Sequence, residues 1–303
     1  MATYYIGPTG DDANDGSYAT PYKNLVSAVN NSRSADTDTI VIKEGTTIQD
    51  VVADGLRLGN RVIVGETGKP ADCVLDFDGL ALYRLAAEQQ CIIEGFTMQN
   101  IVQTLLNRAL FGRIQADQCD PLRINNMIFN NIVVSQSGSV ATGTAGFIAG
   151  ANTTFSNNIL RNIRLGSAGA SGHIFGSEDR DFTTNIRNVS FYYDGSPISG
   201  TQNFDRVFTI RASGSNAVYN VENTIMSFGQ SGTIQNAFAY INEANGGTAT
   251  FNISNCCLHN VDYDDAVNPS TNTITADPLL VDPDNGNFNL RPTSPCIGTG
   301  TLL

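Results

Sequence analysis

The 303-residue sequence has no tryptophan, two histidines and little charge, since Asp, Glu, Lys and Arg together make up 15% of it. With 41% apolar residues, it has the composition of a folded chain and not of a disordered one. Its net charge is −12, and its only lysines are Lys23, Lys43 and Lys69. This balance argues against a nucleic-acid partner or an anionic membrane surface, because both require clustered cations.

Metal-binding cysteine spacings are also absent, because no CxxC or Cys/His pattern occurs. We expect buried free thiols at Cys73, Cys91, Cys119, Cys256, Cys257 and Cys296. The opening residues lack the basic start and apolar run of a secretory signal, and no apolar stretch approaches the roughly 18 residues of a membrane span. We therefore expect synthesis in a host cytoplasm without a signal peptide, and no membrane partner.

What the sequence does contain is a nine-residue pattern that reads apolar–x–Asn–x–x–apolar–x–Asn–apolar. Its six copies are separated by steps of 31, 31, 31, 35 and 32 residues and begin at Ile93, Ile124, Phe155, Ile186, Val221 and Ile253. The third position is Gly95, Asn126, Asn157, Asn188, Asn223 or Asn255. The sixth is Met98, Phe129, Leu160, Phe191, Met226 or Leu258. A period of this length predicts a solenoid.

A second short apolar segment lies between successive copies, near Leu110, Phe147, Ile174, Val207 and Phe238. Strands this short bury an apolar face only when one repeat stacks on the next, about 4.8 Å away. We therefore predict an all-β, single-stranded right-handed parallel β-helix of about eight coils. Sixth-position side chains should stack inside it, and third-position asparagines should form a structural ladder at turns.

We expect a single β-helix domain over residues 1–303, with an N-terminal helical cap at 1–37, coils at 38–275 and a C-terminal cap at 276–303. Such caps cover the open sheet edges of a solenoid. Thr20 is the expected N-cap and Pro21 the first residue of a cap helix that ends at Asn30 and Asn31. Strands are expected at Thr39–Lys43, Arg61–Val64 and Cys73–Phe77.

Three segments carry a resemblance to a known group. YYIGPTGDDANDGSYATPYKNLVSAV (Tyr4–Val29), VIVGETGKPADCVLDFDG (Val62–Gly79) and ADPLLVDPDNGNFNLRPTSPCIGTG (Ala276–Gly300) resemble the opening, an early coil and the closing segment of right-handed parallel β-helix proteins of the pectate-lyase-like superfamily. The resemblance implies the fold. It leaves function open, because that superfamily includes lyases, hydrolases, epimerases, phage spikes and non-catalytic virion parts.

No catalytic, cofactor-binding or metal-binding residue is assigned. Gly65–Pro70 is rejected as a phosphate loop, because proline stands where serine or threonine should bind Mg²⁺. Beyond Lys69 no lysine is available as a lyase base, and the arginines there form no catalytic motif. Four tyrosines are expected to pack or turn and not to stack on sugars: Tyr192, Tyr193, Tyr219 and Tyr240.

Two acidic patches remain as candidate sites. The first surrounds Arg180, just after Gly172 and His173, and consists of Glu178, Asp179 and Asp181. We interpret it as a solvated turn with local ion pairs, with a glycoside-hydrolase carboxylate pair as the alternative. The second adjoins His259 and consists of Asp262, Asp264 and Asp265. We interpret it as a polar loop, with Ca²⁺ binding as the alternative.

These observations favour a virion structural protein of a bacteriophage: a capsid decoration or accessory protein, or a short spike, without catalysis. Its partners would be capsid or tail proteins and a cell-surface glycan. The alternatives are a polysaccharide lyase or glycoside hydrolase, and a non-catalytic glycan- or receptor-binding module. By analogy with phage β-helices we expect a homotrimer. The 35-residue step predicts an extruded loop near Gly195–Asn203 as a contact surface.

Overall fold

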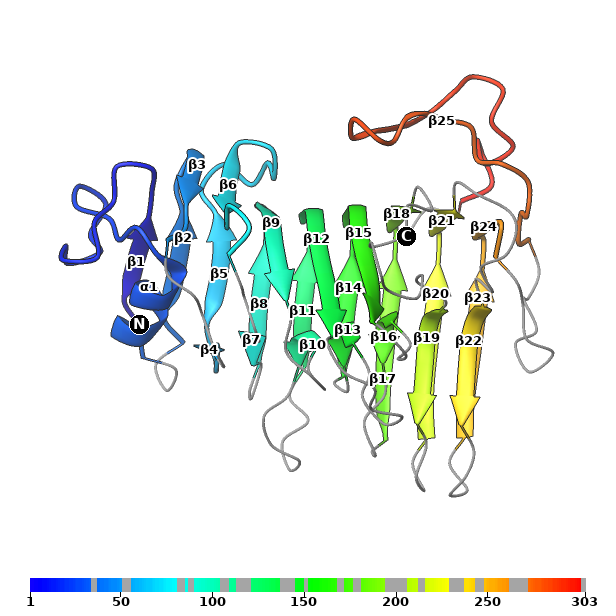
Figure 1. Ribbon diagram of the computed structural model, residues 1–303, viewed down its shortest axis with the longest axis horizontal. Helices are drawn as coiled ribbons and strands as arrows, with labels where there is room; N and C mark the ends of the chain where they lie inside the picture. The colour runs from blue at the N-terminus through cyan, green and yellow to red at the C-terminus, as the bar shows by residue number, and fades with distance from the viewer. Residues whose placement is uncertain are drawn as a thin grey trace.

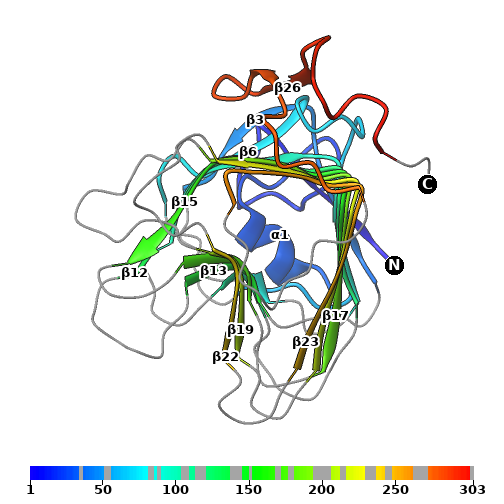
Figure 2. The ribbon, with the colours of Figure 1, turned by 90° about the vertical axis from the view of Figure 1, so that its right-hand side faces the viewer.

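The computed structural model describes residues 1–33, 37–50, 56–80, 85–86, 90–103, 109–112, 121–136, 145–149, 152–167, 172–176, 181–193, 206–211, 216–228, 237–242, 248–261 and 272–300. Within these residues the chain is a parallel β-helix, as the repeat predicts. Its coils stack along one axis from the N-terminal to the C-terminal end (Figure 1). The end-on view shows three sheets around a common interior (Figure 2).

The longest sheet has nine described strands, all parallel to their neighbours. In stacking order they are β1 (Thr3–Ile6), β2 (Thr39–Ile42), β5 (Val62–Gly65), β8 (Cys91–Glu94), β11 (Leu122–Asn125), β14 (Thr153–Ser156), β17 (Phe182–Arg187), β20 (Asn216–Glu222) and β23 (Thr248–Ser254). The first positions of the repeat lie in register here, as Ile124 pairs with Ile93 and with Phe155.

The second sheet, called the eight-strand sheet below, carries the sixth-position residues. Its described strands are β3 (Gly45–Ile48), β6 (Cys73–Asp76), β9 (Thr97–Gln103), β12 (Ile128–Gln136), β15 (Ile159–Ser167), β18 (Ser190–Tyr193), β21 (Ile225–Phe228) and β24 (Cys257–His259). The nine-residue repeat therefore spans two strands. The turn predicted at the third-position asparagines lies between these two strands.

The third sheet contains the segments expected between the repeats. Its described strands are β4 (Leu56–Arg57), β7 (Leu85–Ala86), β10 (Ala109–Gly112), β13 (Ala145–Ala149), β16 (Gly172–Gly176), β19 (Arg206–Arg211) and β22 (Ala237–Asn242). Each coil thus has three strands where all three are described. The sequence predicted at least two.

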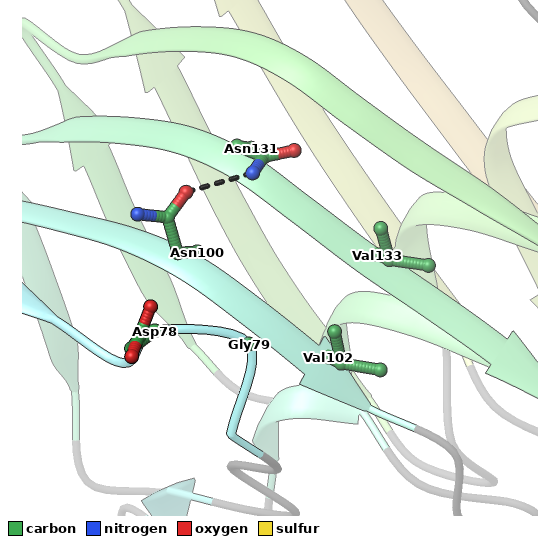
Figure 3. Close-up of a pocket in the computed structure, with 6 residues that line it drawn as sticks. All are labelled: Asp78, Gly79, Asn100, Val102, Asn131 and Val133. Carbon is green, nitrogen blue, oxygen red and sulfur yellow. Dashed lines mark hydrogen bonds between the residues drawn. The ribbon is translucent and has the colours of Figure 1, made fainter. Parts of the chain in front are cut away.

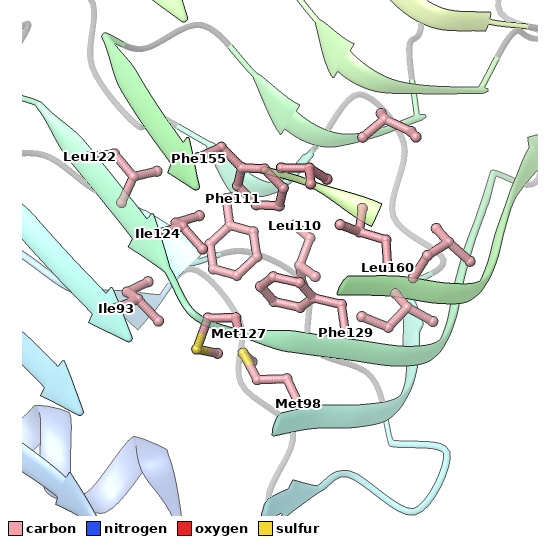
Figure 4. Close-up of a cluster of buried hydrophobic side chains, with 14 of the residues drawn as sticks. Ile93, Met98, Leu110, Phe111, Leu122, Ile124, Met127, Phe129, Phe155 and Leu160 are labelled. Atoms are coloured by element: carbon pink, nitrogen blue, oxygen red, sulfur yellow. The ribbon is translucent and has the colours of Figure 1, made fainter. Parts of the chain in front are cut away.

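The core lies between the three sheets and is built from in-register apolar stacks (Figure 4). All six first-position and all six sixth-position residues are at most 1% exposed. Phe129 faces Phe111 edge-on at 5.7 Å between ring centroids and stacks on Phe155 at 6.1 Å. The predicted internal stack is confirmed, and side chains from all three sheets close around it.

Third-position asparagines form the corner between the first two sheets. Each described one is left-handed, with φ of +49° to +56°, and Gly95 takes the same turn at φ +77°. Asparagine tolerates this conformation because its short side chain bonds locally. The expected copy-to-copy bond is present where Asn188 Nδ2 donates to Asn157 Oδ1 at 3.0 Å. Asn157 instead donates to Asn125 in the preceding coil, so the ladder is mixed.

The N-terminal cap helix begins later than predicted. Helix α1 spans Leu25–Asn31 and packs Leu25, Ala28 and Val29 into the core. Tyr22 is extended instead, because its backbone N–H donates to Tyr5 O and its carbonyl accepts from Gly7. Helix initiation at Pro21 was therefore wrong, whereas its end at Asn31 is confirmed.

Gln49 supplies the missing helix cap from a distance. Its Oε1 accepts a hydrogen bond from the Leu25 N–H at 2.7 Å, and its Nε2 donates to Lys23 O. The expected N-cap Thr20 bonds Asp15 instead. The strands expected at Thr39–Lys43, Arg61–Val64 and Cys73–Phe77 are present as β2, β5 and β6 with ends shifted by one residue.

The C-terminal segment contains an antiparallel hairpin, β25 (Leu280–Asp282) and β26 (Asn287–Leu290). It lies outside the coils, over the outer face of the eight-strand sheet (Figures 1 and 2). Gly286, in the turn of this hairpin, contacts the guanidinium of Arg161 on β15. In the eight-strand sheet β15 is the fourth strand counted from β24. We call residues 276–300 the C-terminal arm.

Candidate functional site

The outer face of the eight-strand sheet carries a polar row that runs along the axis. Its members occupy the seventh position of the repeat, next to the buried sixth, and therefore point outward. Strand pairing places them side by side in successive coils: Asp76, Gln99, Asn130, Arg161, Tyr192, Ser227 and His259. We call this set the outer polar row.

Amide hydrogen bonds link the first coils of the row. Gln99 Nε2 donates to Asp76 Oδ2 at 2.8 Å, and Asn130 Nδ2 donates to Gln99 Oε1 at 3.3 Å. At the other end, Ser227 Oγ lies 3.0 Å from His259 Nδ1. These bonds fix the side chains in place without a ligand, so the row is a preorganised polar surface.

Arg161 is the cation of the row and is poorly compensated. Its Nε atom is buried and has no hydrogen-bond partner within the described part of the chain. Burial lowers the pKa of its guanidinium. The hairpin turn at Gly286 covers the Arg161 guanidinium, so the positive charge lies against the C-terminal arm.

Beside the row lies an open groove of about 350 Å³, within the roughly 300–1,000 Å³ typical of ligand sites. Its lining, drawn in Figure 3, is Asp78, Gly79, Asn100, Val102, Asn131 and Val133. Asp78, Gly79 and Asn131 are exposed, whereas the two valines are half-buried. The groove therefore combines a polar wall with an apolar strip, which suits an amphipathic ligand.

Two consecutive left-handed residues build the first wall of the groove. Asp78 has φ +47° and Gly79 φ +78°. Asp76 stabilises this turn, because its Oδ1 accepts from the Asp78 N–H at 2.9 Å. Gly79 N then donates to Asn100 O and Val102 N to Leu80 O, so residues 77–80 continue along β9. The Asp78 carboxylate is thereby presented to solvent at the rim.

Eighth-position asparagines continue the polar side of the groove in the next two coils (Figure 3). Asn100 and Asn131 are left-handed, with φ of +57° and +52°, and kink β9 and β12 between the row and the two valines. Asn131 Nδ2 donates to Asn100 Oδ1 at 2.7 Å, and Asn100 Nδ2 donates to Asp76 Oδ1 at 2.8 Å (Figure 3). Beyond the kink, Val102 and Val133 pair in register. The two coils that contain β9 and β12 thus each present one amide and one valine, whereas Arg164 takes the valine position in the next coil.

The nine-residue pattern contains the eighth-position asparagines, but no role was predicted for them. A usable signal was present, since Asn100, Asn131 and Asn162 repeat at 31-residue steps. It could not be read as a groove, because the approach of residues 77–80 to β9 depends on coil stacking. The one asparagine ladder that was predicted is that of the third positions, at the other corner of the β-helix.

The first acidic patch is only partly described. Glu178, Asp179 and Arg180 lie outside the described residues, and so does the side chain of His173, whose backbone belongs to β16. Asp181 is exposed and accepts from the Asn216 N–H of the next coil at 2.6 Å. That bond gives Asp181 a structural part in coil stacking.

The second patch is also largely outside the description. Asp262, Asp264 and Asp265 lie outside the described residues, as does the loop at Gly195–Asn203. Among the residues that are described, no group of three or more His, Cys, Asp or Glu side chains is placed to hold a metal ion. Ca²⁺ binding by the second patch therefore stays a prediction.

Tyrosines and cysteines behave mostly as expected. Tyr193 packs on Phe228, and Tyr219 stacks on Phe251 at 5.2 Å, both buried in the core. Buried free thiols are confirmed at Cys73, Cys91, Cys256 and Cys257, whereas Cys296 is free but only half-buried and Cys119 lies outside the described residues. In the part of the chain with assigned structure, no helix is long and apolar enough to cross a membrane.

Comparison with known proteins gives similarity to solved structures alone. No protein-family model and no curated protein matches the chain. A rhamnogalacturonan lyase shares 13% identity at a TM-score of 0.46, over 87% of this chain and 75% of that one. The crystal structure of pectate lyase Pel9A shares 14% at a TM-score of 0.43, over 100% and 92%. Similarity at this level supports no statement about the activity of this chain, and it gives no support for a phage origin.

Proposed function

We propose that this chain is a non-catalytic β-helical protein whose groove at Asp78, Asn100 and Asn131 binds a neutral glycan. The observation that supports this most is the composition of the groove wall. Fixed amides and one carboxylate offer donors and acceptors to sugar hydroxyls, while Val102 and Val133 offer an apolar strip to the C–H face of a ring. The repeat of these groups in two successive coils is compatible with a ligand that is itself a repeating polymer.

Charge favours a neutral ligand over an acidic one. Among the six lining residues, Asp78 is charged and none is a cation. The chain carries a net charge of −12. A uronate carboxylate at these six residues would meet the Asp78 carboxylate, and no lining side chain is a cation that could compensate it. Neutral hydroxyl-rich chains avoid that repulsion.

The number of carboxylates in the groove lining favours binding over hydrolysis. Glycoside hydrolases generally use two carboxyl groups, one of them free to act as an acid. In the groove lining Asp78 is the one carboxylate, and the neighbouring Asp76 already accepts bonds from Asp78 N, Gln99 and Asn100. Cleavage, by hydrolysis or by elimination, is the alternative function that the binding experiment must also address.

The experiment is calorimetric titration with a panel of neutral and uronic-acid oligosaccharides, run beside a reducing-end assay on the same panel. We expect binding to one or more neutral members and no release of reducing ends. Asp78→Asn should weaken neutral binding about 5- to 10-fold, the cost of one hydrogen bond of roughly 1 kcal/mol. Turnover would overturn the non-catalytic assignment, and silence across the panel would overturn glycan binding.

The virion role stays a prediction. A glycan-binding β-helix would serve as an accessory or short spike protein that contacts a host surface, with capsid or tail proteins as partners and a trimer as the expected assembly. Mass spectrometry of purified particles, together with sedimentation of the purified chain, tests these two expectations. Absence from particles or a mass near 32.3 kDa would contradict the respective one.

A further inference from the structure

The C-terminal arm is held to the coils by a short set of contacts around β24. Backbone bonds run from Leu258 N to Ile274 O and from Ile274 N to Cys256 O. The Cys257 thiol lies 3.4 Å from the carbonyl oxygen of Ala276, where the arm begins. Cys257 therefore sits where the last described coil strand meets the arm.

The end of the arm returns to the same place. Ser294 Oγ donates to Pro278 O at 2.5 Å and accepts from the Cys296 N–H at 3.1 Å. These bonds fold residues 294–296 back beside residues 276–278. These contacts bring Cys296 to the same end of the arm at which the Cys257 thiol meets Ala276 O. Two cysteines far apart in sequence meet at the base of the arm.

From this meeting we propose that Cys257 and Cys296 are a modification site, a dithiol that closes to a disulfide and fixes the C-terminal arm over the outer polar row. Cys257 is 3% exposed and lies on the coil side of the junction, whereas Cys296 is half-buried on the arm side. The bond would link the coil side of this junction to its arm side. Oxidation would then hold Gly286 over Arg161, and reduction would free the arm to lift.

The reaction is thiol–disulfide exchange with a small-molecule disulfide such as oxidised glutathione. The more accessible Cys296, as thiolate, attacks one sulfur of the reagent and expels the first glutathione thiolate. Cys257, after losing its proton, then attacks the Cys296 sulfur of the mixed disulfide and expels the second. Two protein thiols are oxidised to one disulfide, one reagent disulfide is reduced to two thiols, and the two protons pass to the leaving thiolates.

Burial supports this order of events. It raises the pKa of the Cys257 thiol, and the hydrogen bond with Cys296 raises it further. Cys257 is therefore a poor first nucleophile but a protected resolving one. The neighbouring Cys256 is not equivalent, because its thiol points to Val221 O and Ser254 O at 3.6 and 3.2 Å and is 1% exposed. Cys256 thus provides a matched control one residue away.

The test is oxidation of the folded chain with oxidised glutathione, alkylation of the remaining thiols, and digestion with a protease that cleaves before aspartate. Such cleavage separates the two cysteines, because Asp277 and Asp284 lie between them. We expect a cross-linked peptide pair in the wild type and in Cys256→Ser, and none in Cys257→Ser or Cys296→Ser. Amides of residues 277–300 should exchange several-fold more slowly after oxidation in the wild type and in Cys256→Ser, and should be unchanged in Cys257→Ser and Cys296→Ser.

Two results would overturn the proposal. One is separate glutathione adducts on each cysteine without a cross-link in the wild type. The other is a cross-link of undiminished yield in Cys257→Ser, which would move the pairing to Cys256. Because Cys296 is half-buried and its serine variant is conservative, Cys296→Ser keeps the experiment informative if Cys257→Ser fails to fold. Glycan binding plays no part in these readouts.

Discussion

Gly286 lies directly against the guanidinium of Arg161, although 125 residues separate the two in sequence. A Cβ built at position 286 would overlap Arg161 Nη1. The same glycine has φ +85°, a conformation that side chains of L-residues rarely adopt. Glycine is required here twice, for the turn between β25 and β26 and for the approach of that turn to the coil body.

Gly286→Ala should therefore loosen the C-terminal arm. The positive φ alone costs about 1–2 kcal/mol in an alanine variant, and the collision with Arg161 adds to it. Gly298→Ala is the matched control, because Gly298 has φ +75° in the same arm and no atom within 4 Å of its built Cβ. Hydrogen exchange at residues 277–300 measures the difference, and equal effects in the two variants would show that the contact contributes nothing.

Arg161→Ala completes the test as a double-mutant cycle. Removing the guanidinium makes room for the alanine side chain, so Gly286→Ala should cost less in the Arg161→Ala background. We expect a coupling of roughly 0.5–3 kcal/mol, the range for residues in contact. Additive effects in the cycle would mean that the arm is held only at its base, around Cys257.

Removal of the Phe129 ring should be far more costly. Phe129 is 0% exposed and contacts the rings of Phe111 and Phe155 in the other two sheets. Phe129→Ala should lower the free energy of unfolding by about 3–5 kcal/mol, measured by urea denaturation. Phe129→Leu is the control and should cost less, because Leu160 and Leu258 fill the equivalent position in other coils. Equal losses would contradict a shape-filling role for the ring.

The sixth-position stack was predictable because a 31-residue period forces equivalent residues into register, and apolar residues repeat there. The turn at Asn126 was also predictable from asparagine's tolerance of left-handed φ, but the repeat alone does not say that two different sheets meet there. The helix start at Leu25 was missed because Tyr22 is held extended by Tyr5 and Gly7, contacts that exist only after β1 has formed. At the helix start, backbone contacts with the distant residues Tyr5 and Gly7 therefore outweighed the local capping signal of Thr20 and Pro21.

The candidate site, like the fold, was only partly predictable from the sequence. Asn100 and Asn131 stood out as repeat positions, and their kinks follow from asparagine's tolerance of left-handed φ. The groove itself needs Asp78, which arrives from the preceding coil through a turn fixed by Asp76. The buried Arg161 Nε, which has no hydrogen-bond partner among the described residues, could not be recognised from sequence either, because its environment depends on where the arm lies.

Acid should weaken the N-terminal end of the chain through Asp38. Its carboxylate is 2% exposed and accepts from Ala2 N and Arg33 N at 2.6 and 2.8 Å. Burial alone would raise the pKa of Asp38, but these bonds outweigh it, and the pKa is lowered below its ordinary 3.8. The folded state then binds protons less readily than the unfolded state, so this stabilisation is present above pH 3.8 and is lost as the pH falls through the folded pKa.

Asp38→Asn isolates that contribution. The amide keeps one acceptor oxygen, so the variant should be less stable than the wild type at neutral pH. The gap should shrink as the pH falls below 3.8, because the wild-type carboxyl becomes protonated and also loses an acceptor. Thermal denaturation followed by circular dichroism from pH 7 to pH 2 measures it, and a gap that stays constant with pH would contradict the role of Asp38.

The groove makes its sharpest prediction at Asn131. This residue is exposed and left-handed, and its side chain extends into the groove wall through its bond to Asn100. Asn131→Gly keeps the backbone conformation, since glycine adopts φ +52° freely, and removes only the amide. Affinity for the neutral glycan should fall about 5- to 10-fold by calorimetry, with the loss of one hydrogen-bonding group.

Asn157→Gly is the control that separates ligand binding from coil stacking. Asn157 is also exposed, has φ +56° and bonds asparagines of both neighbouring coils, but it lies at the other corner of the β-helix. Asn157→Gly should lower the free energy of unfolding at least as much as Asn131→Gly, because it removes the hydrogen bonds to Asn125 and Asn188. Its glycan affinity should equal that of the wild type. A parallel loss of affinity in both variants would indicate that Asn131 acts through the fold and that the groove is not the binding site.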